Sequence, residues 1–369
     1  MDVPRMRRSF RKAEQAGDDA PLWFYSHLFV THPETRALFP VSMATQRDRL
    51  FAALGQVVAL VDDLDTLVPV LQGLGRDHRK FGTVAAHYPA VGASLLATLA
   101  HFDDEWDDAL AADWAAAYEL VARVMVEAAE QASDAPPWWE ADVLTCERRT
   151  LGVTVLQVRP RQELPFRAGQ SISVETGLRP RLWRYYAPAN APRPDGVLEL
   201  HVEAHDGGPV STALAWQLAP GDVLRLGPAL GRFTLPAASD RDLLLVGGGT
   251  GLAPLKALLD EVARTGPARR ADLVLAGEPY DLPALLELAE KFPWLTLTPA
   301  VPDEDGELAD VLESRGPWTS REVFVAGPGA LVRAVAAALT GQGLPPERLH
   351  TETFSPSRPS SRAEGEVSS

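Results

Sequence analysis

The spacing of apolar residues divides the chain into parts of different structure. From Arg5 to about Gln131, apolar residues recur at three- and four-residue steps and glycines are few, a pattern typical of packed helices. Turn-like points interrupt this part at 39–40, 62–65 and 101–104. We therefore expect the first part of the chain to be an all-α domain.

Short runs of alternating apolar and polar residues follow a proline pair at 136–137, which cannot continue a helix. The runs begin at Val143, Val153, Ser171 and Leu198, and the pattern ends near Leu235. Alternation with a period of two indicates antiparallel strands. The middle part is therefore predicted to be an antiparallel barrel or sandwich.

Apolar strands alternate with helical segments in the last part, which indicates an α/β domain with a parallel sheet. The expected strands are 243–246, 273–276, 295–299 and 323–326, and the expected helices are 253–264, 282–291 and 331–339. The final residues are rich in Ser, Arg, Glu and Pro, which predicts a disordered tail. The expected domains are 1–135, 136–240 and 241–354, with the tail at 355–369.

Charge and cysteine content exclude several functions. The net charge is −15 and the chain has only four lysines, so it offers no basic surface for nucleic acid or anionic lipid. No apolar stretch reaches the ~20 residues of a membrane span, and the N-terminus lacks a signal-peptide core, so we expect a soluble cytoplasmic protein. Cys146 is the only cysteine, which excludes internal disulfides, cysteine-held iron–sulfur clusters and covalently attached haem.

A glycine-rich turn follows the first strand of the last part. Residues 243–254 read LLLVGGGTGLAP, so a buried strand runs into a turn and then a helix. The glycines permit close approach of a phosphate, and the helix start offers free amides to it. We predict a phosphate-binding loop, the alternative being an ordinary tight turn.

Six short motifs occur in a fixed order between about residues 140 and 354. They are RYYA (184–187), GPVS (208–211), GPALGRF (227–233), GGGTGLAP (247–254), AGP (326–328) and ETF (352–354). Taken alone, Tyr186 is an ordinary strand aromatic and Arg184 its surface neighbour. In this order the motifs resemble the ferredoxin–NADP reductase superfamily. The resemblance implies an FAD-binding barrel followed by an NAD(P)-binding domain.

The resemblance assigns cofactor-binding roles by position. Arg184 would hold an FAD phosphate, Tyr186 and Ala187 would lie at the flavin, and Phe354 would cover its other face. The remaining residues would bind the FAD pyrophosphate (Gly208, Val210, Ser211) or the dinucleotide (Gly248, Gly249, Thr250, Gly251, Gly327, Pro328).

This chain departs from the superfamily pattern at three places. Ala187 and Ala326 replace a usual serine and cysteine, and Ala168-Gly-Gln-Ser171 replaces a usual Pro-Gly-Gln-Tyr, so slower hydride transfer is expected. Glu278 follows the second strand of the last domain and would disfavour a 2′-phosphate only if it faced the ribose. The choice between NADH and NADPH therefore stays open.

Three polar side chains are predicted to point into the apolar core of the helical part. His78 falls on a stripe with Val68, Leu71, Leu74 and Phe81, Tyr25 on one with Leu22 and Phe29, and Gln46 on one with Leu50, Ala53 and Val57. A hydrogen-bonded core residue is the ordinary explanation for each. Because unpaired polar groups in a core cost a few kcal/mol each, a bound cofactor explains the three together.

Segments 23–39, 46–51 and 77–96 resemble bacterial globins, and the likeness covers about residues 5–131. A globin followed by this reductase is the order found in flavohaemoglobins, which implies haem b, FAD and NAD(P)H as cofactors. By the resemblance, His78 is the ligand of the haem iron, Tyr25 and Gln46 form the distal pocket, and Phe39 packs on the haem. Tyr88 matches a tyrosine near the proximal histidine.

The family also places a glutamate beside the proximal histidine, and its register in this chain is open. Alignment puts Ala129 or Gln131 at that place; Glu130 is preferred and Glu127 is the reserve. The ordinary explanation of both glutamates is a solvated helix face. Asp77 stands where the family has a lysine, which leads us to expect altered electron transfer between the domains.

The resemblance implies an NAD(P)H-dependent nitric oxide dioxygenase. Electrons would pass from NAD(P)H to FAD to haem, and the oxygenated haem would convert NO and O2 into nitrate, with Tyr25 donating a hydrogen bond to the bound oxygen. The alternative is a general NAD(P)H-dependent electron-transfer flavoprotein whose globin has a secondary role. A gas sensor is disfavoured because the tail offers no output domain. Partners other than O2 and NO are not implied, and the oligomeric state stays open.

Overall fold

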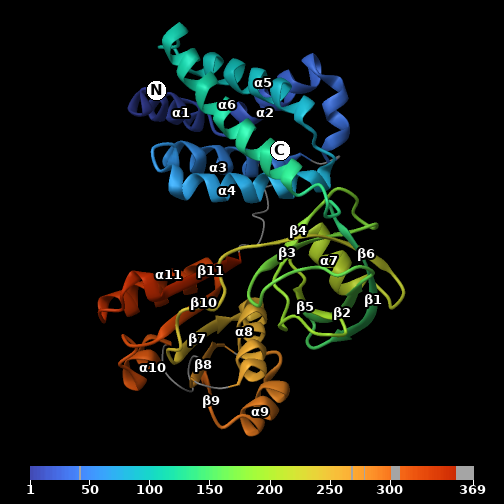
Figure 1. Cartoon of the computed structure of the whole chain (residues 1–369), viewed down its shortest axis with the longest axis vertical. Helices are drawn as coiled ribbons and strands as arrows, with labels where there is room; N and C mark the ends of the chain where they lie inside the picture. Colours follow the sequence, from blue (N-terminus) through green and yellow to red (C-terminus); the bar gives the residue numbers. More distant parts are fainter. Residues whose placement is uncertain (41–42, 267–268, 278, 301–307, 355–369) are drawn as a thin grey trace, which may run out of the picture. The chain divides into compact units, whose positions relative to one another are not determined.

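The computed structural model describes residues 1–369 apart from 41–42, 267–268, 278, 301–307 and 355–369 (Figure 1). The chain divides into two compact units, Met1–Trp138 and Trp139–Ser369, and each is described by itself. The disordered tail expected at 355–369 lies outside the described residues.

The first unit is all-α, as predicted. Its helices are α1 (Val3–Gln15), α2 (Asp19–Thr31), α3 (Ala44–Leu60), α4 (Leu64–His78), α5 (Tyr88–Phe102) and α6 (Asp108–Gln131), with short 3-10 turns at Pro33–Leu38, Arg79–Phe81 and Ala85–His87. Aspartates begin three of these helices: the side chains of Asp2, Asp63 and Asp107 accept hydrogen bonds from backbone N–H groups of the first turn. Such caps satisfy donors that the helix itself leaves free.

Helices α4 and α6 approach closely at Gly75. A Cβ atom on Gly75 would lie 2.2 Å from the carbonyl oxygen of Met125, so only glycine permits this crossing. Around it, Leu67, Leu71 and Met125 form a buried apolar cluster. A larger cluster, which contains Phe24, Tyr25 and Leu99, holds the other helices together.

Two details of the predicted helix faces are wrong. The buried face of α4 carries Leu67 rather than Val68, because positions 67, 71, 74 and 78 follow the 3.6-residue period more closely. Leu22 is 51% exposed and therefore does not share the buried stripe of Tyr25. His78 is still the last residue of α4, on the same face as Leu71 and Leu74.

Among the described residues, no single helix is long and apolar enough to cross a membrane. The segments Leu64–Phe81 and Ala85–Phe102 meet the length and composition requirement only as a pair, and they are bent by 98° at the break. Both belong to the core of the first unit, where Leu71 of α4 and Leu99 of α5 are each 1% exposed.

The second unit begins with an antiparallel barrel, one of the two arrangements predicted for the middle part. Its strands are β1 (Trp139–Arg148), β2 (Val153–Pro160), β3 (Ser171–Thr176), β4 (Arg184–Tyr186), β5 (Leu198–Glu203) and β6 (Val223–Leu230), and helix α7 spans Pro209–Trp216. The strand order is β4-β3-β6-β1-β2-β5. A bridge between Pro188 and Leu200 brings the two edge strands together, which nearly closes the barrel.

The rest of the second unit is a parallel five-stranded sheet with helices, as predicted. The strands are β7 (Leu243–Gly248), β8 (Ala271–Ala276), β9 (Leu295–Ala300), β10 (Glu322–Pro328) and β11 (Leu349–Phe354), in the order β11-β10-β7-β8-β9. The helices are α8 (Leu252–Thr265), α9 (Leu282–Lys291), α10 (Leu308–Arg315) and α11 (Gly329–Gly341), with short 3-10 turns at Gly249–Gly251 and Pro346–Arg348. The sequence did not predict β11 or α10.

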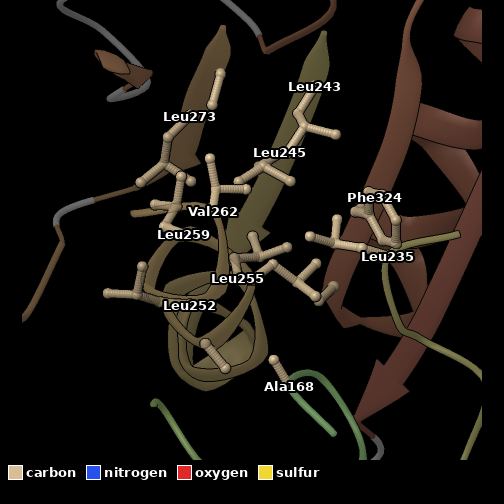
Figure 2. Close-up of a cluster of buried hydrophobic side chains, with 14 of the residues drawn as sticks. Ala168, Leu235, Leu243, Leu245, Leu252, Leu255, Leu259, Val262, Leu273 and Phe324 are labelled. Atoms are coloured by element: carbon tan, nitrogen blue, oxygen red, sulfur yellow. The ribbon is translucent and has the colours of Figure 1, made fainter. Parts of the chain in front are cut away.

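Helix α8 is fixed to the sheet by aliphatic side chains. Figure 2 shows Leu252, Leu255 and Leu259 of α8 against Leu245 and Leu273 of the strands, in a cluster whose members are almost completely buried. Burial of a leucine side chain stabilises a fold by about 1.5–3 kcal/mol. The start of α8, directly after the glycine turn, is therefore held firmly at the carboxyl end of β7.

Replacing Gly75 with alanine is expected to destabilise the helical unit. The added methyl group would collide with the main chain of Met125, and overpacking of this kind costs about 1–3 kcal/mol. A urea titration followed by circular dichroism measures the loss. Arg76→Ala is the matched control, because Arg76 is exposed on the same helix. Equal stability of the two variants would contradict the close packing of α4 and α6.

Candidate functional site

His78 ends helix α4 with one ring nitrogen already engaged. Its Nδ1 lies 2.8 Å from the carbonyl oxygen of Leu74, and because a carbonyl can only accept, Nδ1 carries the hydrogen. Burial lowers the pKa of His78, so the ring is neutral. This tautomer leaves a lone pair on Nε2, which is the form in which histidine binds metals.

Tyr25 lies among aromatic rings on α2 and the following turn. The ring centroids of Tyr25 and Phe39 are 5.4 Å apart in a T-shaped pair, and Phe29 stands at the same distance from Phe39. The Tyr25 hydroxyl donates to the main-chain oxygen of Gln46 over 3.4 Å, which is long for a hydroxyl donor. Burial raises the pKa of Tyr25, so its hydroxyl stays protonated and can donate.

The described contacts bring Tyr25, Phe39 and Gln46 into one group and Tyr88 into another. Tyr88 packs on the cluster of Leu67, Leu71 and Met125, which also includes Leu74 beside His78. Its position is fixed by Tyr118, whose hydroxyl donates to the main-chain oxygen of Tyr88 over 2.7 Å. Helix α3 joins the groups, because Leu50 packs on the cluster of Tyr25 and Val57 on that of Tyr88.

The glutamates of α6 lie away from this arrangement. Glu127 and Glu130 are both exposed, as is Gln131, while Ala129 is half-buried. Among the described residues no hydrogen bond or ion pair joins either glutamate to His78, whose Nδ1 is held by Leu74 instead. A carboxylate partner for His78 stays a prediction.

A buried ion pair next to His78 was not foreseen. Nζ of Lys80 lies 2.6 Å from Oδ1 of Asp77, and the two side chains are 1% and 9% exposed. The Lys80 ammonium also stands 5.1 Å from the Phe81 ring centroid, and that ring makes a T-shaped contact with His78. The three-residue spacing of Asp77 and Lys80 could have indicated this ion pair from the sequence. A lysine is therefore present beside His78 although residue 77 itself is acidic.

In the second unit, β4 presents Arg184 and Tyr186 on one face. Residues two apart in a strand share a face, and the intervening Tyr185 is 41% exposed. Tyr186 pairs with Ile172 of β3 and packs against the barrel core. The guanidinium of Arg184 donates to the main-chain oxygen of Trp183 over 2.9 Å, and Ala187 is buried.

The start of α7 is a compact turn next to the same barrel core. The Ser211 hydroxyl donates to the Gly208 carbonyl over 3.1 Å and accepts from the backbone N–H of His205 over 3.3 Å. A Cβ on Gly208 would lie 2.5 Å from the Ser211 Oγ, so a larger residue here would require the Ser211 side chain to move. Val210 is fully buried in the core that contacts Tyr186, so its role is to pack the start of α7 against the barrel.

The glycine turn after β7 serves both packing and access. A Cβ on Gly251 would lie 2.2 Å from the Ala326 carbonyl oxygen, and one on Gly327 would lie 2.9 Å from the Gly248 carbonyl oxygen, so the ends of β7 and β10 touch through their backbones. Gly249 is exposed and has a φ of +54°. Gly249 and the half-buried Thr250 are therefore the positions that a phosphate can approach.

Strand β11 brings Phe354 to this junction. Its parallel pairing with β10 places Phe354 opposite Pro328, the exposed residue that precedes α11. Phe354 is half-buried and packs against the apolar cluster of α8 and the sheet. The final motif of the sequence begins 101 positions after Gly251, yet it lies close to the glycine turn.

A small hollow lies at the carboxyl ends of β7 and β8, where ligands bind in α/β domains. It is lined by Gly247, Gly249, Leu252, Leu275, Ala276, Pro279 and Tyr280. The sequence indicated the glycines but not Tyr280, whose hydroxyl contacts His201 of the barrel. Glu278, the residue considered for ribose recognition, lies outside the described residues.

The sequence matches two protein families. Residues 22–125 match the globin family, and residues 149–235 match the oxidoreductase FAD-binding domain family. The first match contains Tyr25 and His78, and the second contains Arg184, Tyr186 and Ser211.

Whole-chain comparisons join the two matches. The flavohemoprotein of Bacillus subtilis (strain 168) is 26% identical over 380 residues, covering 93% of this chain and 94% of that protein. A flavohemoglobin structure from Malassezia yamatoensis, with bound FAD and heme, has a TM-score of 0.80 at 16% identity and covers 96% of this chain and 98% of that one. The FAD/NAD binding domain of a nitric oxide dioxygenase from Vibrio cholerae has a TM-score of 0.53 at 20% identity and covers 60% of this chain and 100% of that one.

These structural likenesses show a shared fold, and the sequence matches show a globin domain that precedes an FAD-binding oxidoreductase domain in one chain. The relative from Bacillus has the same extent, since each chain covers over nine-tenths of the other. The chain is therefore identified as a member of the flavohaemoglobins.

Proposed function

We propose that this flavohaemoglobin is an NAD(P)H-dependent nitric oxide dioxygenase that converts NO and O2 into nitrate, with haem b and FAD as its cofactors. The observation that carries the proposal is His78, a neutral imidazole whose Nδ1 is held by Leu74 and whose Nε2 is left for a metal. A nitric oxide dioxygenase with a related FAD/NAD domain supports the same activity.

The residues of the first unit fit a haem. His78 offers Nε2 as the iron ligand, and the carbonyl of Leu74 fixes the orientation of the ring. Tyr25 keeps a protonated hydroxyl whose only described bond is the long one to Gln46, so it can turn to a better acceptor. Phe39 supplies an aromatic surface in contact with Tyr25.

The second unit fits a flavin and a dinucleotide. We propose that residues 136–240 hold FAD through Arg184, Tyr186, Ala187 and the turn from Gly208 to Ser211, and that residues 241–354 hold NAD(P)H. Gly208 directly precedes α7, and the first turn of a helix offers unpaired backbone N–H groups to a phosphate. A phosphate of the dinucleotide can likewise approach the backbone at Gly249, the exposed position of the glycine turn.

The cofactors supply the redox chemistry: FAD converts the two-electron donor NAD(P)H into a source of single electrons, and haem iron accepts those electrons and binds diatomic gases. The chain's own contribution is position and polarity. Tyr25 donates a hydrogen bond into the gas-binding side and stabilises negative charge there. Phe354 and Tyr186 limit the space around the flavin and exclude water from it.

Replacing His78 with alanine is expected to abolish NO consumption and to remove haem absorption, because the iron loses its ligand. FAD content and NAD(P)H-dependent reduction of ferricyanide should remain, since no flavin-binding residue changes. Absorption spectra and an NO electrode in the presence of O2 and NAD(P)H measure both properties. His32→Ala is the control, because His32 belongs to the same unit and is partly exposed.

Two results would overturn the dioxygenase proposal. One is unmodified protein that contains haem but consumes no NO with O2 and NAD(P)H present. The other is NO consumption that persists in His78→Ala. Rapid reduction of external acceptors together with negligible NO consumption would instead favour the general electron-transfer flavoprotein.

The variant Tyr25→Phe tests whether the Tyr25 hydroxyl donates a hydrogen bond to the bound gas. Loss of a hydrogen bond to a charged or strongly polar group costs about 1.5–3 kcal/mol, which predicts an apparent KM for O2 raised by about tenfold or more. Steady-state NO consumption at a series of O2 concentrations measures it. Tyr118→Phe is the control, because it removes a tyrosine hydroxyl from the same unit that donates to the main-chain oxygen of Tyr88 instead of that of Gln46. An unchanged KM for O2 in Tyr25→Phe would exclude Tyr25 from this role.

A further inference from the structure

A chain of polar contacts runs from the hollow at the glycine turn into the barrel. The Tyr280 hydroxyl contacts Nδ1 of His201, Nε2 of His201 lies 2.9 Å from Glu199, and Glu199 lies 3.1 Å from Nζ of Lys256. Lys256 also binds Asp281. Strand β5 of the barrel, helix α8 and the start of α9 are thus connected by a single set of side chains.

The direction of these hydrogen bonds is determined by charge. Burial lowers the pKa of His201, so its ring is neutral and has one N–H. Although burial opposes ionisation, the hydrogen bond from His201 and the charge of Lys256 lower the pKa of Glu199 to about 2. The ionised Glu199 must accept from Nε2, so Nδ1 accepts the hydrogen of the Tyr280 hydroxyl.

This series of polar contacts connects the hollow to the barrel. Tyr280 is one wall of the hollow that also contains Gly247 and Gly249. His201 and Glu199 lie within β5, paired with Val155 and Gln157 of β2, and are therefore fixed in the barrel. A molecule in the hollow contacts a side chain whose far end is held by the barrel.

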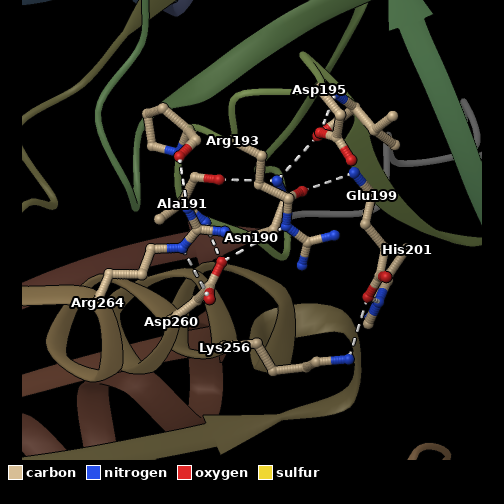
Figure 3. A network of polar contacts seen from close by, with 11 residues as sticks. Asn190, Ala191, Arg193, Asp195, Glu199, His201, Lys256, Asp260 and Arg264 are labelled. Carbon is tan, nitrogen blue, oxygen red and sulfur yellow. Dashed lines mark hydrogen bonds and ion pairs between the residues drawn. The ribbon is translucent and has the colours of Figure 1, made fainter.

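A second set of polar contacts joins helix α8 to the barrel, away from the hollow. In Figure 3, Asp260 and Arg264 of α8 face the barrel segment that contains Ala191 and Arg193. Asp260 accepts from the Ala191 N–H over 3.0 Å, and Arg264 donates to the Pro192 carbonyl over 3.2 Å. Asp260 lies one helical turn beyond Lys256, so it provides a control that keeps the hollow intact.

We propose that Tyr280 is a positioning residue for hydride transfer, with His201 and Glu199 acting through it. The inference rests on the proposed function, in which NAD(P)H is oxidised to NAD(P)+ and its hydride, with two electrons, is taken up by FAD. The Tyr280 ring forms the wall against which the dinucleotide lies, and its hydroxyl ties that wall to β5. The wall and the flavin-binding barrel therefore keep a fixed relation during the transfer.

The expected effect follows from the strength of one hydrogen bond. A neutral hydrogen bond contributes about 1 kcal/mol, which corresponds to about a fivefold change in an equilibrium or a rate. Tyr280→Phe keeps the ring and removes only the hydroxyl. Dinucleotide affinity should therefore change less than twofold, while the limiting rate of flavin reduction should fall about fivefold because the reacting groups are less well aligned.

Stopped-flow reduction of the flavin by NADH and by NADPH, without O2, separates the limiting rate from the dissociation constant. His201→Gln provides a second variant, since glutamine can accept from Tyr280 and donate to Glu199, and it should retain most of the rate. Tyr280→Phe with His201→Gln should be no slower than Tyr280→Phe alone. Asp260→Asn should lower the melting temperature and leave the limiting rate within twofold.

Hydrogen exchange gives a measurement that does not depend on turnover. Addition of NAD+ to the holoprotein should slow exchange of the amides at 198–203 in the unmodified protein, and this protection should be lost in Tyr280→Phe. A lower limiting rate of flavin reduction together with loss of this protection in Tyr280→Phe supports the inference. An unchanged limiting rate or unchanged protection in Tyr280→Phe overturns it while the proposed function stands. Absence of flavin reduction by either dinucleotide in the unmodified protein overturns the proposed function and the inference with it.

Discussion

Direct contact between backbones, permitted by glycine, is the constraint on which both units depend. At Gly75, helix α4 meets the main chain of α6, and at Gly251 the turn after β7 meets the carbonyl oxygen of Ala326. In each place a side chain would force the elements apart by more than a packed interior tolerates. The first contact fixes the helix that ends in His78, and the second brings the glycine turn against the end of β10.

Local ion pairs replace an overall positive field in this acidic chain. The net charge is −15 with four lysines, and two of these lysines lie in ion pairs next to the candidate sites. Lys80 pairs with Asp77 beside His78, and Lys256 pairs with Glu199 and Asp281 beside the hollow. Buried pairs of this kind add little net stability. Their effect is to fix the direction of neighbouring polar groups, as His201 shows.

Much of the fold could be predicted from periodicity. The helix expected at 282–291 has the same bounds as α9, and the strand expected at 243–246 lies within β7. Strand β11 was missed because it lies at the sheet edge, where exposed and half-buried residues alternate without a strong apolar run. The prediction that Leu22 is buried was wrong, because Leu22 lies at the margin of the buried face of α2.

The sequence by itself determined the order of the elements, the glycine turn and the presence of polar residues on apolar helix faces, because each depends on neighbours in the chain. It could also indicate His78, Tyr25 and the flavin motifs as candidates. Only the tertiary structure decided the partners: the Leu74 carbonyl that selects the tautomer of His78, and His201, which meets Tyr280 across 79 positions of sequence. Such contacts depend on which strands and helices pack together, and no local pattern specifies that.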